Sequence, residues 1–223
     1  MKKLLFVFLM LPSILLAQKS HFRVNTFWAG LGASYTNLDA LNTALSSYNS
    51  KIFPINPKLV NVNVGYFHLN RRLCYGLDVS GLTRTFAVSG IGDPTFAYIR
   101  EALVMPKIGV VAYQFDEVYF FYPTIGIGGG GSYMRYRTPG EGTLYKRNAY
   151  GMAIEGALNA TIITPIPGDR DNNAVIGIAA GYLYTPLIGN DWKVSDRLIG
   201  TAVASPQGFF FRVGFGMGTG NRD

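Results

Sequence analysis

The sequence predicts an all-β protein, an eight-stranded antiparallel transmembrane β-barrel with short turns at one rim and long loops at the other. First, successive segments alternate bulky apolar residues with small ones, as in AVIGIAAGYLYT over residues 174–185, and neither row suits contact with bulk water. Second, short and long connections alternate strictly along the chain. Third, the composition is 15% charged and 14% aromatic with 27 glycines, which is too few charges to coat an ordinary wet surface.

The N-terminal residues 1–17 are expected to be a cleaved signal peptide, followed by one barrel domain over residues 18–223. Lys2 and Lys3 form a basic start, an apolar run follows, and the small residue Ala17 precedes the expected cleavage point. The apolar run is shorter than the ~20 residues that a membrane-spanning helix needs. No later apolar run is long enough either, so a membrane location requires strands.

Period-two alternation bounded by turn residues defines eight expected strands. In chain order they cover residues 27–35, 59–69, 73–85, 98–113, 118–136, 150–164, 174–185 and 208–218. The expected short turns are residues 70–72, 114–117 and 165–173, and the expected long loops are residues 36–58, 86–97, 137–149 and 186–207. An even number of strands with one short and one long rim is the layout of an outer-membrane barrel, with periplasmic turns and extracellular loops.

Each expected strand has a bulky apolar row and a less apolar row, and the residues of the less apolar row decide which face meets lipid. In the strand at residues 59–69, valines and a tyrosine alternate with Asn61, Asn63 and Gly65. The strands at residues 73–85, 150–164 and 208–218 follow the same rule, with mostly Gly, Ala, Ser or Asn and one or two charges in the less apolar row. Such a row fits the narrow interior of an eight-stranded barrel, which its own side chains fill, so we expect the bulky row to face lipid.

The strand at residues 118–136 resists this assignment because it contains the glycine run GIGGGGS at residues 126–132. A phosphate-binding loop would need a following Gly-Lys-Ser/Thr and a helix, and both are missing from the sequence at this point. Glycines inside a strand indicate a bulge or a close approach of neighbouring backbone. We therefore predict one of these two structures here and leave the faces of this strand unassigned.

The inner rows carry six charges, three acidic and three basic. They are Asp78, Arg84, Glu101, Lys107, Glu155 and Arg212. An unpaired charge in a low-dielectric interior is costly, whereas matched signs form charge-assisted hydrogen bonds across the lumen. The sequence thus predicts a lumen charge network in a plugged barrel without an open pore. The alternative is that some of these residues lie near the rims.

The chain resembles the small eight-stranded outer-membrane barrels of the OmpA/OmpX class over nearly all of its mature length. The resemblance rests on the strand layout, on repeated aromatic-glycine strands such as AVIGIAAGYLYT, and on the aromatic last strand GFFFRVGFGMG. Chains of that class usually end at an aromatic residue, whereas residues 219–223 follow here. The resemblance implies the outer membrane of a Gram-negative bacterium and a structural or interaction protein, or an accessory subunit of an envelope complex.

Enzymatic chemistry is not expected, because the candidates are poor. Only His21 and His68 are available as histidines, and Asp78 is offset from His68 along the expected hairpin, so a Ser/His/Asp triad does not assemble. Cys74 is the single cysteine, and we expect neither a metal site nor a cofactor. Two alternatives stay open: a lipid-modifying barrel enzyme, and a soluble exported barrel that binds an apolar ligand inside its bulky rows.

The extracellular loops hold the remaining candidates, and we expect function to lie there. Leu38, Leu41 and Leu45 have helical spacing in the first loop, which predicts a partner-binding helix or a lid over the barrel mouth. The other candidate contacts are Arg135, Arg137, Lys146 and Arg147 in and around the third loop and Trp192 in the fourth. The basic group predicts either binding of glycolipid phosphates or anchoring at the membrane interface.

The expected partners are therefore outer-membrane lipid and glycolipid, and envelope proteins are a further candidate. The formal charge of +7 includes Lys2 and Lys3 of the expected signal peptide, so the mature chain carries about +5. That surplus is mild and lacks basic runs interleaved with exposed aromatic residues, so nucleic acid is not an expected partner.

Overall fold

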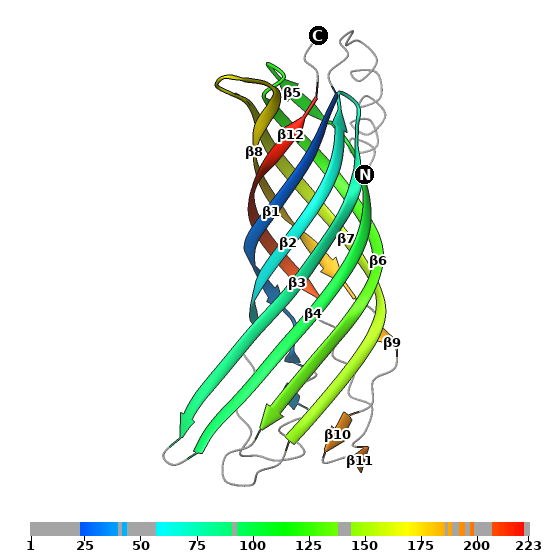
Figure 1. The fold of residues 1–223 in the computed structure, drawn as a ribbon. Helices are drawn as coiled ribbons and strands as arrows, with labels where there is room; N and C mark the ends of the chain where they lie inside the picture. The colour runs from blue at the N-terminus through cyan, green and yellow to red at the C-terminus, as the bar shows by residue number, and fades with distance from the viewer. Residues whose placement is uncertain are drawn as a thin grey trace.

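The computed structural model describes residues 23–39, 42–43, 57–90, 93–137, 144–185, 187–188, 192–194, 197–198 and 207–220. Eight long strands form the barrel drawn in Figure 1. They are β1 (Arg23–Thr36), β2 (Lys58–Asn70), β3 (Leu73–Gly90), β4 (Asp93–Val110), β6 (Tyr119–Arg137), β7 (Leu144–Ile166), β8 (Asp169–Tyr184) and β12 (Gly208–Thr219). The expected signal peptide lies outside the described residues.

The strands close into a ring in which every neighbouring pair is antiparallel. Each long strand pairs with the next along the chain, β8 pairs with β12, and β1 pairs with β12. The closing pair runs from Asn25 opposite Thr219 to Thr36 opposite Gly208 without a break in register. Closure leaves no unpaired edge at membrane depth, where water is absent and each free backbone group would be costly. The predicted fold class is confirmed.

The expected strand at residues 98–113 is wrong at its end. Strand β4 stops at Val110, and a separate short strand, β5 (Tyr113–Phe115), forms a hairpin with the start of β6. The backbone amide of Val111 donates to the carbonyl of Arg72 in the neighbouring turn. This bond extends the β3–β4 pairing by one residue, the amide of Ala112 then donates to the carbonyl of Phe121, and Asp116 and Glu117 make the following turn with positive φ angles of 55° and 54°.

The expected long loop at residues 86–97 is also wrong, because pairing continues through most of it. Strands β3 and β4 stay in register as far as Gly90 opposite Asp93. The alternation of apolar residues stops where the wall leaves the apolar medium, but backbone hydrogen bonds between strands do not depend on it. Strands β3, β4, β6 and β7 therefore reach 18, 18, 19 and 23 residues, against 14, 13 and 12 for β1, β2 and β12.

These four long strands extend beyond the rim as a projecting sheet, seen at the lower left of Figure 1. Strand β2 pairs with β3 only as far as Val60 opposite Thr83. Two short strands, β9 (Leu187–Ile188) and β10 (Trp192–Val194), pair with the far side of β7, and β11 (Arg197–Leu198) pairs with β10. The projecting sheet lies at the extracellular rim, opposite the short turns.

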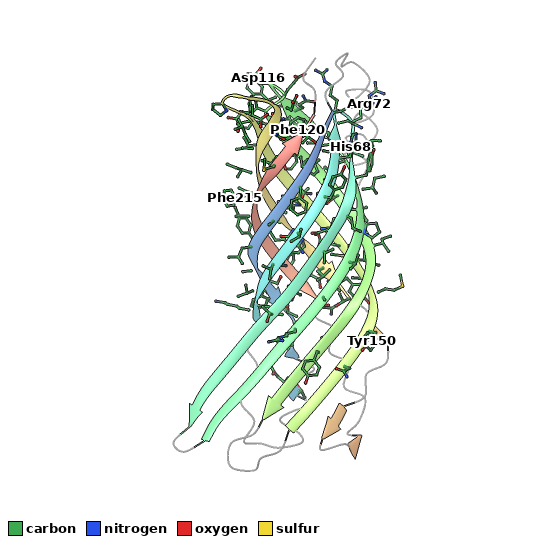
Figure 2. All side chains as sticks on the ribbon, in the orientation of Figure 1. His68, Arg72, Asp116, Phe120, Tyr150 and Phe215 are labelled. Carbon is green, nitrogen blue, oxygen red and sulfur yellow. The ribbon has the colours of Figure 1, made fainter. Side chains whose placement is uncertain are left out.

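The two faces of the wall have inverted polarity compared with a soluble barrel. Ile176 and Ile178 on β8 are 42% and 44% exposed, whereas Asn61, Asp78 and Arg212 face inward and are almost completely buried. Figure 2 shows Phe215 on the outside of the barrel, and Arg72 and Asp116 at the rim of short turns. The exterior thus requires lipid, and the alternative of a soluble barrel with bulky rows inside is wrong.

Aromatic residues border the apolar band at both levels. Tyr66, Tyr75, Tyr113, Phe115, Tyr119 and Phe121 are exposed toward the turn rim, and Tyr35, Tyr150, Tyr182, Tyr184 and Phe209 toward the loop rim. Between them lie exposed aliphatic residues such as Leu31, Val104 and Ile127. Two aromatic girdles around an aliphatic band are typical of outer-membrane barrels. The chain is a transmembrane β-barrel of the Gram-negative outer membrane.

The faces of β6 follow from its neighbours. Phe121, Ile125 and Ile127 face outward, and Phe120 and Tyr122 face inward. The register with β7 runs unbroken from Tyr119 opposite Ile162 to Arg137 opposite Leu144, so the glycine run contains no bulge. The glycines instead allow close approach, because a Cβ at Gly126 would lie 2.9 Å from Cγ of Lys107.

We predict that Ile178→Arg blocks assembly of the barrel while Ile178→Leu does not. Ile178 is exposed on the lipid face, and an arginine near the middle of that face costs about 2 to 4 kcal/mol. Folding into lipid vesicles, read as heat-modifiable migration on a gel, measures the outcome. Equal folding of the two variants would show that this face does not meet lipid.

Candidate functional site

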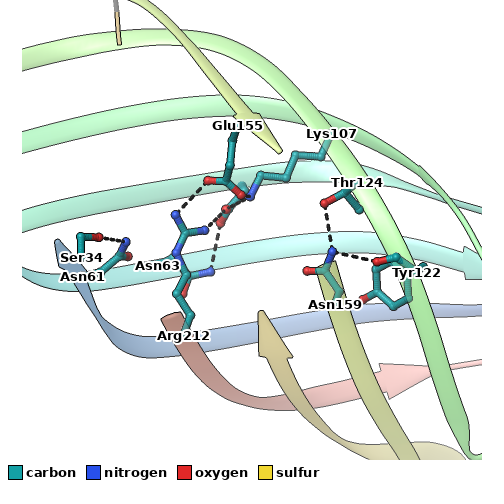
Figure 3. Close-up of polar contacts among 10 residues, drawn as sticks. Ser34, Asn61, Asn63, Lys107, Tyr122, Thr124, Glu155, Asn159 and Arg212 are labelled. Atoms are coloured by element: carbon teal, nitrogen blue, oxygen red, sulfur yellow. Dashed lines mark hydrogen bonds and ion pairs between the residues drawn. The ribbon is translucent and has the colours of Figure 1, made fainter. Parts of the chain in front are cut away.

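The charged centre of the lumen is a layer of four side chains from four strands. Asp78 comes from β3, Lys107 from β4, Glu155 from β7 and Arg212 from β12. Nζ of Lys107 forms ion pairs with Oδ2 of Asp78 and, at 2.6 Å, with Oε1 of Glu155. Arg212 bridges the same two acids, with Nη1 3.0 Å from Asp78 Oδ2 and Nη2 2.9 Å from Glu155 Oε2 (Figure 3). Each base thus contacts both acids.

Neutral neighbours hold this charge layer in place. Nδ2 of Asn63 donates to Oδ1 of Asp78 at 3.1 Å, which occupies the oxygen that the two bases leave free. The guanidinium of Arg212 lies 4.0 Å from the ring centre of Phe210. Gly126 lies directly opposite Lys107 on the next strand and leaves space for its side chain. The roles of Phe210 and Gly126 were not predicted from the sequence. For Gly126, a small residue directly opposite a long charged one on the neighbouring strand is a pattern that could have indicated its role.

Two apolar layers enclose the charges along the barrel axis. The layer toward the turn rim contains Val24, Phe67, Leu69, Cys74, Val111, Phe120, Tyr122, Ile163 and Val175. The layer toward the loop rim contains Leu59, Leu82, Leu103, Met105, Ala153, Ala157, Ala179, Leu183 and Phe210. The partly buried Trp28 packs against both layers. The lumen is thus filled by side chains, as the narrow interior of an eight-stranded barrel permits.

The four charges balance and leave almost no contact with water. Their side chains are 6% exposed for Lys107 and at most 1% for the other three. Burial costs each ion several kcal/mol of hydration, which mutual attraction repays only with good geometry and satisfied hydrogen bonds. Loss of one member would leave a buried charge without compensation. The layer therefore acts as a unit that joins four strands across the lumen.

Of the other two predicted members of the network, only Glu101 has a described side chain, and it has no contact with the charge layer. Glu101 is 4% exposed, and among the described residues neither of its carboxylate oxygens has a hydrogen-bond partner. Arg84 occupies the position opposite Ile99 on β4, and its side chain lies outside the described residues. The structure thus brings together four of the six predicted charges and leaves Glu101 separate in the loop-side half of the lumen.

The remaining polar contacts in the lumen are short local pairs. Nδ2 of Asn61 donates to Ser34 Oγ at 3.1 Å, and the hydroxyl oxygens of Tyr122 and Thr161 lie 2.9 Å apart. Asn159 donates to Thr124 Oγ1 at 3.0 Å (Figure 3). These bonds satisfy buried polar groups and hold neighbouring strands in register.

His68 lies at the turn rim and takes no part in a catalytic arrangement among the described residues. Its Nδ1 is 2.8 Å from Oδ1 of Asn25, and its ring lies 4.9 Å from that of Tyr75. Asp78 contacts the bases of the charge layer instead. The described residues also hold no cluster of three or more side chains suited to a metal ion.

The first extracellular connection begins with a helical turn. Asn37 Oδ1 accepts a hydrogen bond from the amide of Asp39 at 3.0 Å, and the amide of Asn42 donates to the carbonyl of Leu38 at 2.8 Å. Asn37 is therefore the residue that caps the turn. Leu38 is buried at 3% exposure, while Leu41 and Leu45 lie outside the described residues.

The predicted basic contacts share neighbouring positions in the projecting sheet. Arg135 on β6 is opposite Lys146 on β7, and Lys146 is opposite Lys193 on β10. Arg147 stands opposite Met134 on one side and Trp192 on the other. Arg137 is opposite Leu144 at the end of the described ladder. The side chains of Arg135, Arg137, Lys146, Arg147 and Trp192 lie outside the described residues.

Comparison with known proteins finds likeness to solved structures alone. The attachment invasion locus protein Ail of Yersinia pestis, crystallised with the heparin analogue sucrose octasulfate, matches with a TM-score of 0.49 and 14% identity over 89% of this chain and 99% of that chain. Neisserial surface protein A matches with a TM-score of 0.36 and 11% identity over 90% and 97%. No protein-family model and no curated sequence matches this chain. The assignment of the barrel rests on its own strand pairing and exposed faces.

We predict that Lys107→Met lowers the free energy of unfolding by about 3 to 5 kcal/mol, because it leaves one negative charge buried without compensation. Combining it with Glu155→Gln restores a neutral layer, so the double variant should be more stable than the sum of the two single effects by about 1 to 3 kcal/mol. Urea titration of the barrel in lipid vesicles gives these values. Lys107→Met with Ile178→Leu is the additive control, and additivity in both pairs would refute a coupled layer.

We further predict that the purified protein forms no stable open channel in a planar lipid bilayer at neutral pH. Two apolar layers and a paired charge layer fill the lumen and leave no continuous aqueous path. Single-channel recording beside an established porin as positive control makes the measurement. Steady conductance steps from the wild-type protein would contradict a plugged lumen.

Proposed function

We propose that this protein is an outer-membrane interaction protein that binds polyanionic carbohydrate through its extracellular projecting sheet. The ligand chemistry is a phosphate- or sulfate-bearing sugar, which either a glycolipid headgroup or a free polysaccharide supplies. The barrel acts as a closed anchor, and binding rather than catalysis is its role. An accessory position in an envelope complex is compatible with the same anchor and sheet.

The observation that carries the proposal is the register of basic residues across three strands. Arg135, Lys146 and Lys193 occupy directly opposed positions on β6, β7 and β10, and Arg147 is adjacent to Lys146. Directly opposed positions in a sheet lie about 5 Å apart, so like charges there repel one another unless an anion binds. Arginine and lysine are also the residues that recognise phosphate and sulfate groups.

The geometry of the barrel supports a role outside the cell. The four strands that carry or support the basic positions extend past the membrane band, while the connections described at the opposite rim are tight turns. Loops and extensions on a rigid scaffold carry binding disproportionately. The described part of the chain assembles no nucleophile, base and orienting residue at that rim, which favours binding over lipid modification.

We predict that Arg135→Ser with Lys146→Ser weakens binding to heparin about tenfold at physiological salt, because each exposed ion pair contributes up to about 1 kcal/mol. Heparin serves as a soluble polyanion, and binding is measured by surface plasmon resonance on detergent-solubilised protein. Binding of the wild type should also fall as salt screens the charges.

The matched control is Arg23→Ser with Arg72→Ser, which removes two exposed positive charges at the opposite rim. This control should bind heparin like the wild type. If both double variants lost binding equally, the effect would be due to net charge, and the projecting sheet would not be the binding site.

A further inference from the structure

The outer face of the wall contains a groove that neither the lumen nor the projecting sheet explains. Its volume is about 550 Å³, and it crosses strands β2, β3, β4, β6 and β7. One row of directly opposed residues forms its floor and sides: Val62, Gly81, Ala102, Gly131 and Tyr150. The three central residues carry at most one side-chain carbon, whereas Val62 and Tyr150 stand exposed on either side.

A polar row borders the groove on its extracellular side. Thr83, Arg100, Tyr133 and Asn148 are opposed across β3, β4, β6 and β7, and all four line the groove. The next row toward the turns is apolar, with Val64, Val79, Val104 and Met152 exposed. The groove therefore runs from the hydrocarbon band to the level of the lipid headgroups, where Tyr150 marks the outer aromatic girdle.

Gly81, the floor residue next to Val62, is not required by packing. A Cβ there would lie 3.6 Å from the carbonyl oxygen of Glu101, which is an ordinary contact. By contrast, a Cβ at Gly128 or Gly130 would overlap the backbone of β4. Glycine weakens a strand because it adds conformational entropy to the unfolded chain and packs no side chain. The effect of glycine at position 81 is to deepen the groove.

The groove is bordered by positive charge on its extracellular side. Arg100 is exposed at the headgroup level, and the following row places Arg135 and Lys146 in register with Tyr98 of β4. Glu101 also lines the groove, but it belongs to the inner row and is 4% exposed, so it adds little negative charge to the outward surface. A guanidinium beside an apolar groove matches a phosphate attached to an acyl chain.

We propose that this groove binds one phosphorylated glycolipid of the outer leaflet, with an acyl chain over Gly81 and a phosphate at Arg100. The exterior already faces lipid, so the occupant is selected from the leaflet by its phosphate and not by burial alone. This site lies in the membrane wall, one row of residues away from Arg135 and Lys146, and it shares no residue with the polyanion site proposed for the projecting sheet. It gives the barrel a bound lipid at a defined position among its strands.

The test compares lipid retention by native mass spectrometry after the purified protein is incubated in detergent with bis-phosphorylated lipid A. The wild type should retain one lipid A per barrel. Arg100→Gln should lower the affinity about tenfold through loss of a charged hydrogen bond, and Gly81→Leu should abolish retention by filling the floor. Dephosphorylated lipid A should bind the wild type as weakly as intact lipid A binds Arg100→Gln.

Matched controls separate the groove from the rest of the wall. Gly156→Leu adds the same side chain at a second glycine of the outer face, where a Cβ meets nothing within 4 Å, and it should retain lipid A like the wild type. Lys58→Gln removes an exposed charge on β2 outside the groove and should also be neutral. Retention by Gly81→Leu equal to that of Gly156→Leu would overturn the proposal.

The proposed contact between the lipid phosphate and Arg100 can be tested even if Gly81→Leu fails to fold, because Arg100→Gln and the dephosphorylated lipid test it independently. Equal affinity of the wild type for intact and dephosphorylated lipid A would also overturn the proposal. Heparin binding by Gly81→Leu should remain at the wild-type level, so failure at the groove is distinguishable from failure of the projecting sheet.

Discussion

Closure of the backbone ladder between β1 and β12 is the constraint on which the rest of the structure depends. In a hydrocarbon medium no water replaces a missing backbone hydrogen bond, so a sheet survives only without edges. The unbroken register from Asn25 to Thr36 against β12 meets that requirement. Once the ring of eight strands is closed, its radius is small and the space inside has to be filled by the strands themselves.

The filling of the lumen explains the location of the charged side chains. Long side chains from four strands meet at the barrel centre, and a base that contacts two acids satisfies more donors than an isolated pair. Apolar residues alone would fill the same space without directional bonds. The charge layer instead ties β3, β4, β7 and β12 by specific contacts, with Asn63 accommodating the remaining oxygen of Asp78. Such a layer favours one register of the strands, whereas a purely apolar interior would tolerate several registers equally.

The sequence predicts the ring and the two faces of the wall because burial alternates with period two inside the membrane band. It does not predict the projecting sheet, because strand pairing beyond Thr83 continues without that alternation. It places Asp78, Lys107, Glu155 and Arg212 on inner rows, but which inner residues meet across the lumen depends on the stagger of the closed barrel. For the same reason it does not separate Glu101 from the four that meet. The faces of β6 needed the register with β7, since glycines carry no side chain to reveal a face.

Small residues serve opposite purposes on the two sides of the same wall. On the inner side they admit large neighbours: Gly126 leaves space for Lys107, and a Cβ at Gly177 would lie 3.0 Å from the ring of Trp28. On the outer side Gly81 and Gly156 have no such neighbour within close contact distance. An inner glycine is therefore explained by the protein's own packing, whereas an outer glycine shapes the surface that lipid meets. The composition of the wall is rich in glycine for both reasons, and only the register of the strands tells them apart.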